Sequence, residues 1–234
     1  MDTINNLRIL DIKPDSNTRA IVIWLHGLGA SANDFEPVLP IINEITPGIR
    51  YIFPNAPVMS VSINGGMTMP AWYDVSHPDL SQQADLPGIY ASCEKLSGLV
   101  EHIRNEVGED IPVILAGFSQ GGVIALTTAL TTMRTTTLPD ATAEPCNIQG
   151  VLALSAYLPE INALKQKDKL DLSLLMMHGS NDPIVPIEHA RHSFDKLSQL
   201  ISNTRWQEYP MDHTLCYEEV QQIGEWLKTL IAKK

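Results

Sequence analysis

The chain contains little of several features whose absence narrows its function. Among its 234 residues are only three cysteines, Cys93, Cys146 and Cys216, and they lack the spacing of a disulfide framework or a metal site. No apolar run approaches the ~18 residues that a membrane span needs. The opening MDTINNLRIL has no basic region before an apolar core, as a signal peptide would. We therefore expect a soluble, cytoplasmic protein from a reducing compartment, with no stable membrane anchor.

Basic residues are also few, since 16 Lys and Arg face 27 Asp and Glu, giving a formal net charge of -11. This balance makes nucleic acid an unlikely partner. A hydrophobic fraction of 44% with 18% charged residues suits a globular protein with a sizeable core. At this length we expect one domain over residues 1–234. Nothing in the sequence indicates a cofactor or a metal; the pair His189 and His192 lacks further ligands at persuasive spacing.

Short apolar runs alternate with longer helical patterns along the chain. This alternation predicts an α/β fold with a mostly parallel central sheet and helices on both faces. The predicted strands are Leu7–Ile12 at an edge, Ile21–Leu25, Ile49–Phe53, Val113–Ala116, Gly150–Leu154, Leu172–Met177 and Arg205–Tyr209. Apolar residues at helical spacing predict helices over Gly88–Val107 and Ile187–Ile201, and a final one through Val220, Ile223, Leu227 and Ile231. Pro54–Pro87 and Thr131–Asn147 are predicted to be irregular connections.

The residues Gly117-Phe118-Ser119-Gln120-Gly121 form a G-x-S-x-G pattern between a predicted strand and a predicted helix. Such a strand-to-helix turn, called a nucleophile elbow, lifts a serine hydroxyl clear of the sheet. A serine hydroxyl is a poor nucleophile at neutral pH, so it needs a base and a group that orients the base. The pattern alone is weak evidence for a catalytic serine. Whether a base and an orienting group accompany it decides between the two readings.

Candidates for those partners follow two later strands. His213 lies in the loop before the last helix, where it would reach the carboxyl edge of the sheet, and we predict that it is the base. Asp182, in HGSNDPIVP, also follows a strand and precedes a helix, so it is predicted to orient His213. His178 ends a strand, where its ring would bridge loops. Asp212 neighbours His213 directly and is a poor orienter for that reason.

A developing oxyanion needs backbone N–H donors. One is expected from Gln120, the residue after the serine, at the start of the helix. The other is expected from Leu28 in the loop His26-Gly27-Leu28-Gly29, which follows an early predicted strand.

Taken together, HGLGASANDF, FPNAP, AWYD, GFSQGG, ALSAYLP, HGSNDPIVP and YPMDHTLCYEE resemble the phospholipase/carboxylesterase family in order and spacing. The resemblance runs from about Arg19 to the C-terminus. It implies an α/β-hydrolase fold without a large cap domain. It also implies a triad of Ser119, Asp182 and His213, with Leu28 and Gln120 as oxyanion donors.

The same resemblance implies an acyl-binding groove. Residues Val58–Met69 would form a mobile flap over it, with Ile63 and Met67 as substrate contacts, Trp72 at its base and Ile184 near its mouth. Ordinary packing is the alternative reading of Ile63, Met67 and Ile184. A homodimer that uses the apolar flap as its contact is left open.

We therefore expect a serine hydrolase that cleaves carboxylic esters or thioesters of aliphatic acyl groups through an acyl-enzyme. Its substrate would be a small molecule, a lysophospholipid or an acylated protein. The alternatives are a serine peptidase or an acyltransferase on the same fold, and a non-catalytic protein that binds acyl groups.

Overall fold

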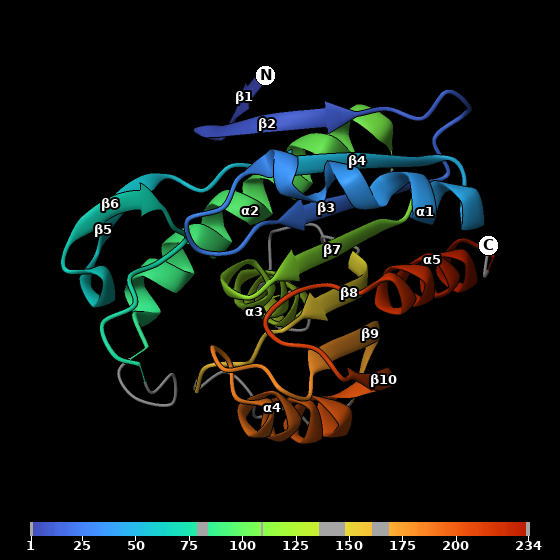
Figure 1. Cartoon of the computed structure of the whole chain (residues 1–234). Helices are drawn as coiled ribbons and strands as arrows, with labels where there is room; N and C mark the ends of the chain where they lie inside the picture. Colours follow the sequence, from blue (N-terminus) through green and yellow to red (C-terminus); the bar gives the residue numbers. More distant parts are fainter. Residues whose placement is uncertain (1, 79–83, 109, 136–147, 161–168, 233–234) are drawn as a thin grey trace.

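The main sheet of the computed structural model has the strand order β1-β2-β4-β3-β7-β8-β9-β10 (Figure 1). The structure describes residues 2–78, 84–108, 110–135, 148–160 and 169–232. β1 and β2 are antiparallel to their neighbours, while the strands from β4 to β10 run parallel. The strands are β1 (Asp2–Ile4), β2 (Leu7–Ile12), β3 (Ala20–Leu25), β4 (Ile49–Pro54), β7 (Val113–Phe118), β8 (Ile148–Leu154), β9 (Leu170–Gly179) and β10 (Ile201–Tyr209). Parallel strands all end at one edge, so the loops that follow them meet there.

Alternate residues of the central strands supply two separate cores. In β3, Ile21 and Ile23 face one core, whereas Val22 and Trp24 face the other. All six residues of β3 are buried. A strand covered on both faces has no need of polar alternation, which is why these runs are almost continuously apolar.

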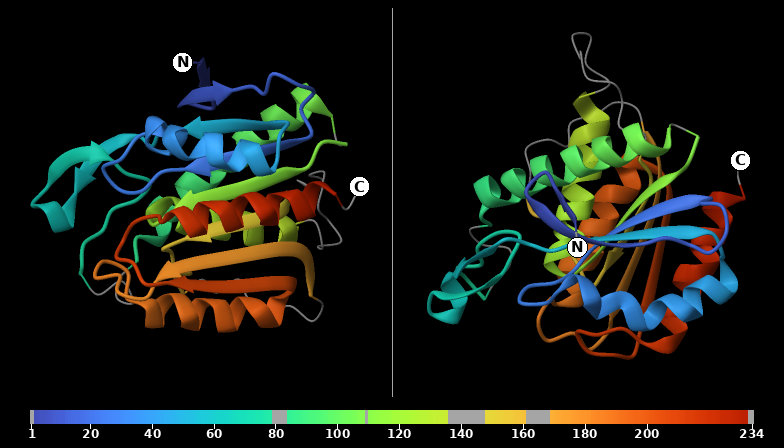
Figure 2. Two further views of the ribbon diagram at one scale, coloured as in Figure 1. Left: turned by 45° about the vertical axis from the view of Figure 1, so that its right-hand side comes forward. Right: turned by 90° about the horizontal axis from the view of Figure 1, so that it is seen from above.

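Helices cover both faces of the sheet (Figure 2). One face carries α2 (Leu86–Val107), α3 (Gln120–Thr135) and α4 (Ile187–Leu200), and the other carries η1 (Ala32–Val38), α1 (Leu39–Ile45) and α5 (Tyr217–Ile231). The fold class predicted from the sequence is confirmed. Within the described part of the chain there is no large cap domain.

A hairpin stands beside the carboxyl edge of the sheet, where the sequence predicted only irregular chain. It consists of β5 (Val58–Val61) and β6 (Met67–Pro70), joined by η2 (Ser62–Asn64). Gly65 and Gly66 close the turn at φ of 66° and 80°, in the left-handed region that glycine tolerates best. The apolar and polar residues of β5 do not alternate, and Val58 is 70% exposed, so the strand pattern was not visible in the sequence.

The segment Thr131–Asn147, predicted to be irregular, begins as a helix in the structure. Residues 131–135 continue α3, and residues 136–147 lie outside the described ranges. Thr131 donates its hydroxyl hydrogen to the Thr127 carbonyl at 2.8 Å, one turn earlier. This back-bonding satisfies the threonine hydroxyl within the helix.

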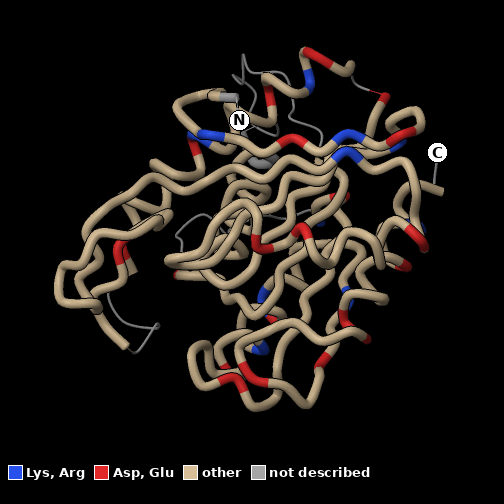
Figure 3. Tube along the Cα trace, turned by 45° about the horizontal axis from the view of Figure 1, so that its top comes forward, with Lys and Arg blue, Asp and Glu red and all other residues tan. Residues whose placement is uncertain are grey.

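Three features of the described residues bear on nucleic-acid, metal and membrane binding. Acidic positions are spread over many elements (Figure 3). Three or more metal-ligating side chains do not gather anywhere in the described ranges. In those ranges, too, the helices are too short or too polar to cross a membrane.

Candidate active site

Ser119 occupies the turn between β7 and α3 with its backbone in the left-handed region, at φ of 52°. This conformation is strained for a residue with a Cβ, and such strain concentrates at functional sites. The surrounding glycines permit the turn. A Cβ on Gly117 would lie 2.3 Å from the backbone of Gly121, and one on Gly121 would lie 2.4 Å from the Leu25 carbonyl oxygen. The elbow is therefore wedged against the end of β3.

Asp182 and His213 meet in the loops that follow β9 and β10. The Nδ1 atom of His213 lies 2.7 Å from Oδ2 of Asp182. Gly179 allows the two loops to approach, because a Cβ there would lie 2.4 Å from the Met211 carbonyl oxygen. An ionised carboxylate only accepts hydrogen bonds, so Nδ1 of His213 carries the hydrogen and Nε2 is left as an acceptor.

Asp182 is held in its ionised form. Burial raises the pKa of this carboxyl, but hydrogen bonds from His213 and from the Val185 and Ile184 amides outweigh it, so the pKa is lowered. Both amides donate to Oδ1 at 2.9 Å. The orienting group predicted from the sequence is thus a carboxylate with donors on both oxygens.

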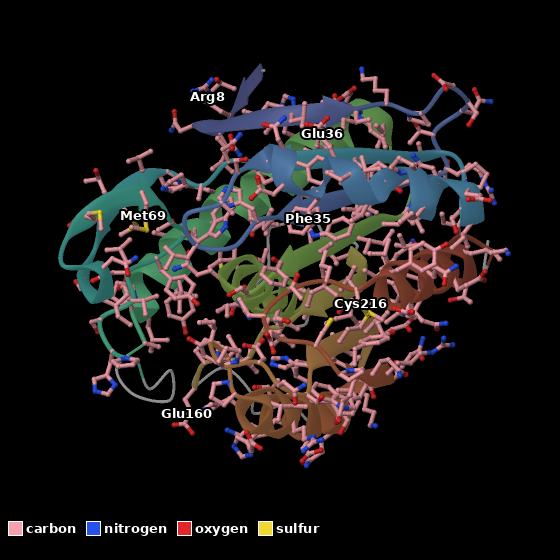
Figure 4. The ribbon with its side chains drawn as sticks, viewed as in Figure 1. Arg8, Phe35, Glu36, Met69, Glu160 and Cys216 are labelled. Atoms are coloured by element: carbon pink, nitrogen blue, oxygen red, sulfur yellow. The ribbon has the colours of Figure 1, made fainter. Side chains whose placement is uncertain are left out.

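Ser119 and His213 line one cavity of about 760 Å³. The ring of Phe118, the residue before Ser119, packs against the ring of His213 at a centroid distance of 4.7 Å. This contact places the histidine beside the elbow. The cavity wall is largely apolar and includes Phe35 (labelled in Figure 4), Val38, Ile63, Val75, Ile184 and Leu215. Such a cavity suits a ligand with an aliphatic part.

The loop after β3 lies directly against the elbow. A Cβ on Gly27 would be 3.5 Å from the Cβ of Ser119, and Leu28 and Gln120 both line the cavity. Gly29 takes φ of 73°, and its amide donates to the Pro70 carbonyl at 2.8 Å. Met69, labelled in Figure 4, packs beside Gly29. The residues of the two predicted oxyanion donors therefore both line the cavity. The hairpin braces the loop that carries Leu28.

His26 and Trp72 hold this loop from behind. The Ala56 amide donates to Nε2 of His26 at 3.0 Å, so Nδ1 carries the hydrogen and donates to the Gly27 carbonyl at 2.7 Å. Burial lowers the pKa of His26, which favours this neutral form. Trp72 donates its indole hydrogen to the His26 carbonyl at 2.9 Å. No role for His26 was predicted from the sequence, although its position in the motif HGLG marked the loop.

Gln120 also acts through its side chain. Its amide nitrogen donates to the Tyr73 carbonyl at 2.7 Å, and its amide oxygen accepts from the Trp72 amide at 2.9 Å. The residue after the serine is thus tied to a segment almost fifty positions earlier. No local pattern predicts a contact of this kind.

The four predicted substrate contacts divide into two pairs. Ile63 and Ile184 line the cavity and are 40% and 58% exposed. Met67 is 66% exposed on the hairpin and is not part of the lining. Trp72 is not part of it either, because its indole is buried behind the oxyanion loop. The placement of Trp72 at the base of the groove is therefore not supported by the structure.

Asp74 fastens the hairpin to the cavity wall. Its carboxylate accepts from the Ser62 amide at 2.7 Å and from the Ser62 hydroxyl at 2.5 Å. The next amide, that of Ile63, donates to the Val75 carbonyl at 2.7 Å. These bonds hold Ile63 at the cavity in this structure. The mobility of residues 58–69 stays a prediction.

Glu219, in the first turn of α5, is fully buried six residues after His213. Among the described residues, neither of its carboxyl oxygens has a hydrogen-bond partner within bonding distance. Burial raises the pKa of Glu219 from 4.5 to about 8, an effect that the nearby Cys216 amide offsets only in part.

Because the folded protein binds this proton more tightly than the unfolded chain, the free energy of unfolding should fall as pH rises from about 4.5 to 8. Each pKa unit corresponds to about 1.4 kcal/mol, so the full loss is on the order of 4 kcal/mol. Glu219→Gln should remove this dependence and be the more stable protein at pH 8. Urea unfolding at pH 5, 6.5 and 8 measures it. Glu218→Gln, an exposed neighbour with the same charge change, is the control. Equal pH dependence in both variants and the parent would contradict the assignment.

Comparisons with known proteins point to one family. A family model described as Phospholipase/Carboxylesterase matches residues 9–231. The chain is 33% identical to acyl-protein thioesterase 1 of Cryptococcus neoformans var. neoformans serotype D over 242 residues, covering 95% of this chain and 97% of that protein. It is 30% identical to acyl-protein thioesterase 1 of Mycosarcoma maydis, with 96% and 98% covered.

A solved structure of another acyl-protein thioesterase is also similar to this chain. The crystal structure of Zea mays acyl-protein thioesterase 2 superposes with a TM-score of 0.80 at 28% identity, covering 96% of this chain and 99% of that one. The family model, the relatives and this solved structure each cover almost the whole length of the chain. The chain therefore belongs to the phospholipase/carboxylesterase family of α/β-hydrolases.

Proposed function

We propose that this protein cleaves carboxylic esters or thioesters of aliphatic acyl groups with Ser119 as nucleophile, His213 as base and Asp182 as orienting acid. One observation carries the proposal. A histidine bonded at 2.7 Å to a buried carboxylate lies in the same apolar cavity as a serine on a strained elbow. Three residues from three different loops need not meet for reasons of packing alone.

The reaction follows from this arrangement. Nε2 of His213 takes the proton of the Ser119 hydroxyl as Oγ attacks the acyl carbonyl carbon. The tetrahedral intermediate collapses when His213 returns the proton to the leaving alcohol or thiol, which leaves an ester between the acyl group and Ser119. Water then attacks that ester with His213 again as base, which releases the carboxylic acid and restores the serine.

The oxyanion is assigned to the backbone amides of Leu28 and Gln120. Both residues line the cavity beside Ser119. The Gln120 amide also starts α3, so the helix dipole adds to its field. A preorganised donor of this kind typically contributes about 3 kcal/mol to the stability of the transition state. The side-chain bonds of Gln120 and the His26 network keep both donors in place.

The acyl group is assigned to the apolar wall that includes Ile63 and Ile184. The relatives are named acyl-protein thioesterases. An acylated protein joined through a thioester is therefore the first substrate class to test, followed by lysophospholipids and small esters. A peptidase or an acyltransferase would use the same three residues. A binding protein would have no need of the His213 to Asp182 bond.

Rates on one acyl group in three linkages test the proposal. With an octanoyl group carried as a thioester, an oxygen ester and an amide, we expect the first two to be hydrolysed and the amide to remain intact. Added alcohol should not divert the acyl group from water. Preferred cleavage of the amide would favour a peptidase, and transfer to alcohol would favour an acyltransferase. Binding of the acyl group without turnover of any linkage would favour the non-catalytic alternative.

A further inference from the structure

A second histidine approaches the carboxylate that orients His213. His178, near the end of β9, is fully buried. Its Nε2 atom lies 2.8 Å from the Val185 carbonyl oxygen and 3.5 Å from Oδ2 of Asp182. Oδ2 is the same oxygen that accepts from His213 at 2.7 Å.

The surroundings of His178 determine which nitrogen carries its hydrogen. Both groups near Nε2 are acceptors, so Nε2 must be the protonated nitrogen. Among the described residues, Nδ1 has no hydrogen-bond partner, and a second proton there would have none to bond with. Burial lowers the pKa of His178, which keeps the ring neutral. His178 therefore presents a fixed N–H toward the carboxylate and carries no positive charge of its own.

The same ring closes the loop that carries Asp182. Oδ1 of Asp182 accepts from the amides of Ile184 and Val185, and the carbonyl of Val185 accepts from His178. The loop is thus closed on itself by Asp182 and bonded to β9 through Val185. On its other side the ring of His178 stacks on Trp206 of β10, with an interplanar angle of 16°. Ile184 and Val185 also line the cavity.

We propose that His178 is a positioning residue, whose Nε2–H holds the Asp182 loop closed through the Val185 carbonyl and lies close to the oxygen that serves His213. This inference rests on the proposed function and names a further residue on which its base depends. The titratable groups that face His178 are Asp182, His213 and Glu208. Without the N–H, more of the negative charge on Oδ2 is available to His213. The acid limb of the rate profile should therefore move to higher pH.

Three substitutions separate this role from packing. His178→Phe keeps a flat ring against Trp206 and removes the donor. His178→Gln places an amide N–H close to the position of Nε2, whereas the shorter His178→Asn does not reach it. For His178→Phe and His178→Asn we expect about a tenfold lower kcat, the usual effect of one lost hydrogen bond. We also expect the acid limb of their rate profiles at higher pH. His178→Gln should restore both, and Trp206→Phe should leave the acid limb unmoved.

A second measurement does not depend on turnover. The Nδ1 proton of His213, bonded to Asp182, should give a downfield proton NMR signal that shifts in His178→Phe and returns in His178→Gln. If His178→Phe folds and both its NMR signal and its pH profile match those of the parent, the proposal is wrong. The proposal is also wrong if kcat falls as much in His178→Gln as in His178→Asn. If His178→Phe does not fold, the comparison of His178→Gln with His178→Asn tests the proposal. A parent that cleaves no ester would instead contradict the proposed function, while the NMR comparison still tests His178.

Discussion

Ser119→Ala is expected to lower kcat for ester or thioester hydrolysis by about a millionfold, to a rate close to the residual catalysis by the cavity alone. Alanine removes the only atom that can form the acyl-enzyme. It adds no new backbone strain, because serine already holds a Cβ at φ of 52°. The measurement is kcat for one octanoyl thioester under conditions in which chemistry limits the rate.

Ser155 provides a matched control for this substitution. It follows β8, the neighbour of β7 in the sheet, and has a similar backbone at φ of 46°. It is buried and does not line the cavity. Ser155→Ala should therefore keep near-parental activity. Activity in Ser119→Ala within tenfold of the parent would exclude Ser119 as the nucleophile.

Asp182→Asn is expected to lower kcat by about ten thousandfold. The Ile184 and Val185 amides both donate to Oδ1, so an asparagine must place its carbonyl oxygen there. Its NH2 group then faces His213 and donates to Nδ1. That reverses the tautomer of His213, puts the hydrogen on Nε2, and leaves no acceptor for the serine proton.

The control is Asp212→Asn, which removes the same charge beside His213. Asp212 is exposed, and among the described residues its side chain forms no hydrogen bond or ion pair with His213. We expect its kcat to stay within a few-fold of the parent. Equal losses in the two variants would mean that net charge near His213, rather than the oriented hydrogen bond, supports the reaction.

The sequence predicted the sheet well because its inner strands have no solvent face. β3, β7 and β8 are buried on both sides, so each is a short, nearly unbroken apolar run between turn residues. The hairpin of β5 and β6 escaped prediction for the opposite reason. It lies largely outside the two cores, so burial imposes no regular pattern of apolar residues on its strands.

Candidate site residues were predictable where chain order and the strand ends decide their place. Ser119, Asp182 and His213 each follow a parallel strand, so they meet at one edge. The supporting contacts were not predictable. The bond from Gln120 to the Tyr73 carbonyl and that from Trp72 to the His26 carbonyl join residues more than forty positions apart. The family resemblance placed Trp72 at the base of the groove, but its indole hydrogen needs an acceptor, which the His26 carbonyl of the loop provides.

The activity of Ser119 as a nucleophile can be tested without knowing the natural substrate. A fluorophosphonate forms a stable bond to a serine that a neighbouring histidine deprotonates. Treated with excess reagent at pH 8, the parent should take up one equivalent, found by mass spectrometry on the peptide that contains Ser119, and lose its esterase activity in parallel. Ser119→Ala should take up none. Labelling at another residue, or full labelling of Ser119→Ala, would contradict the account.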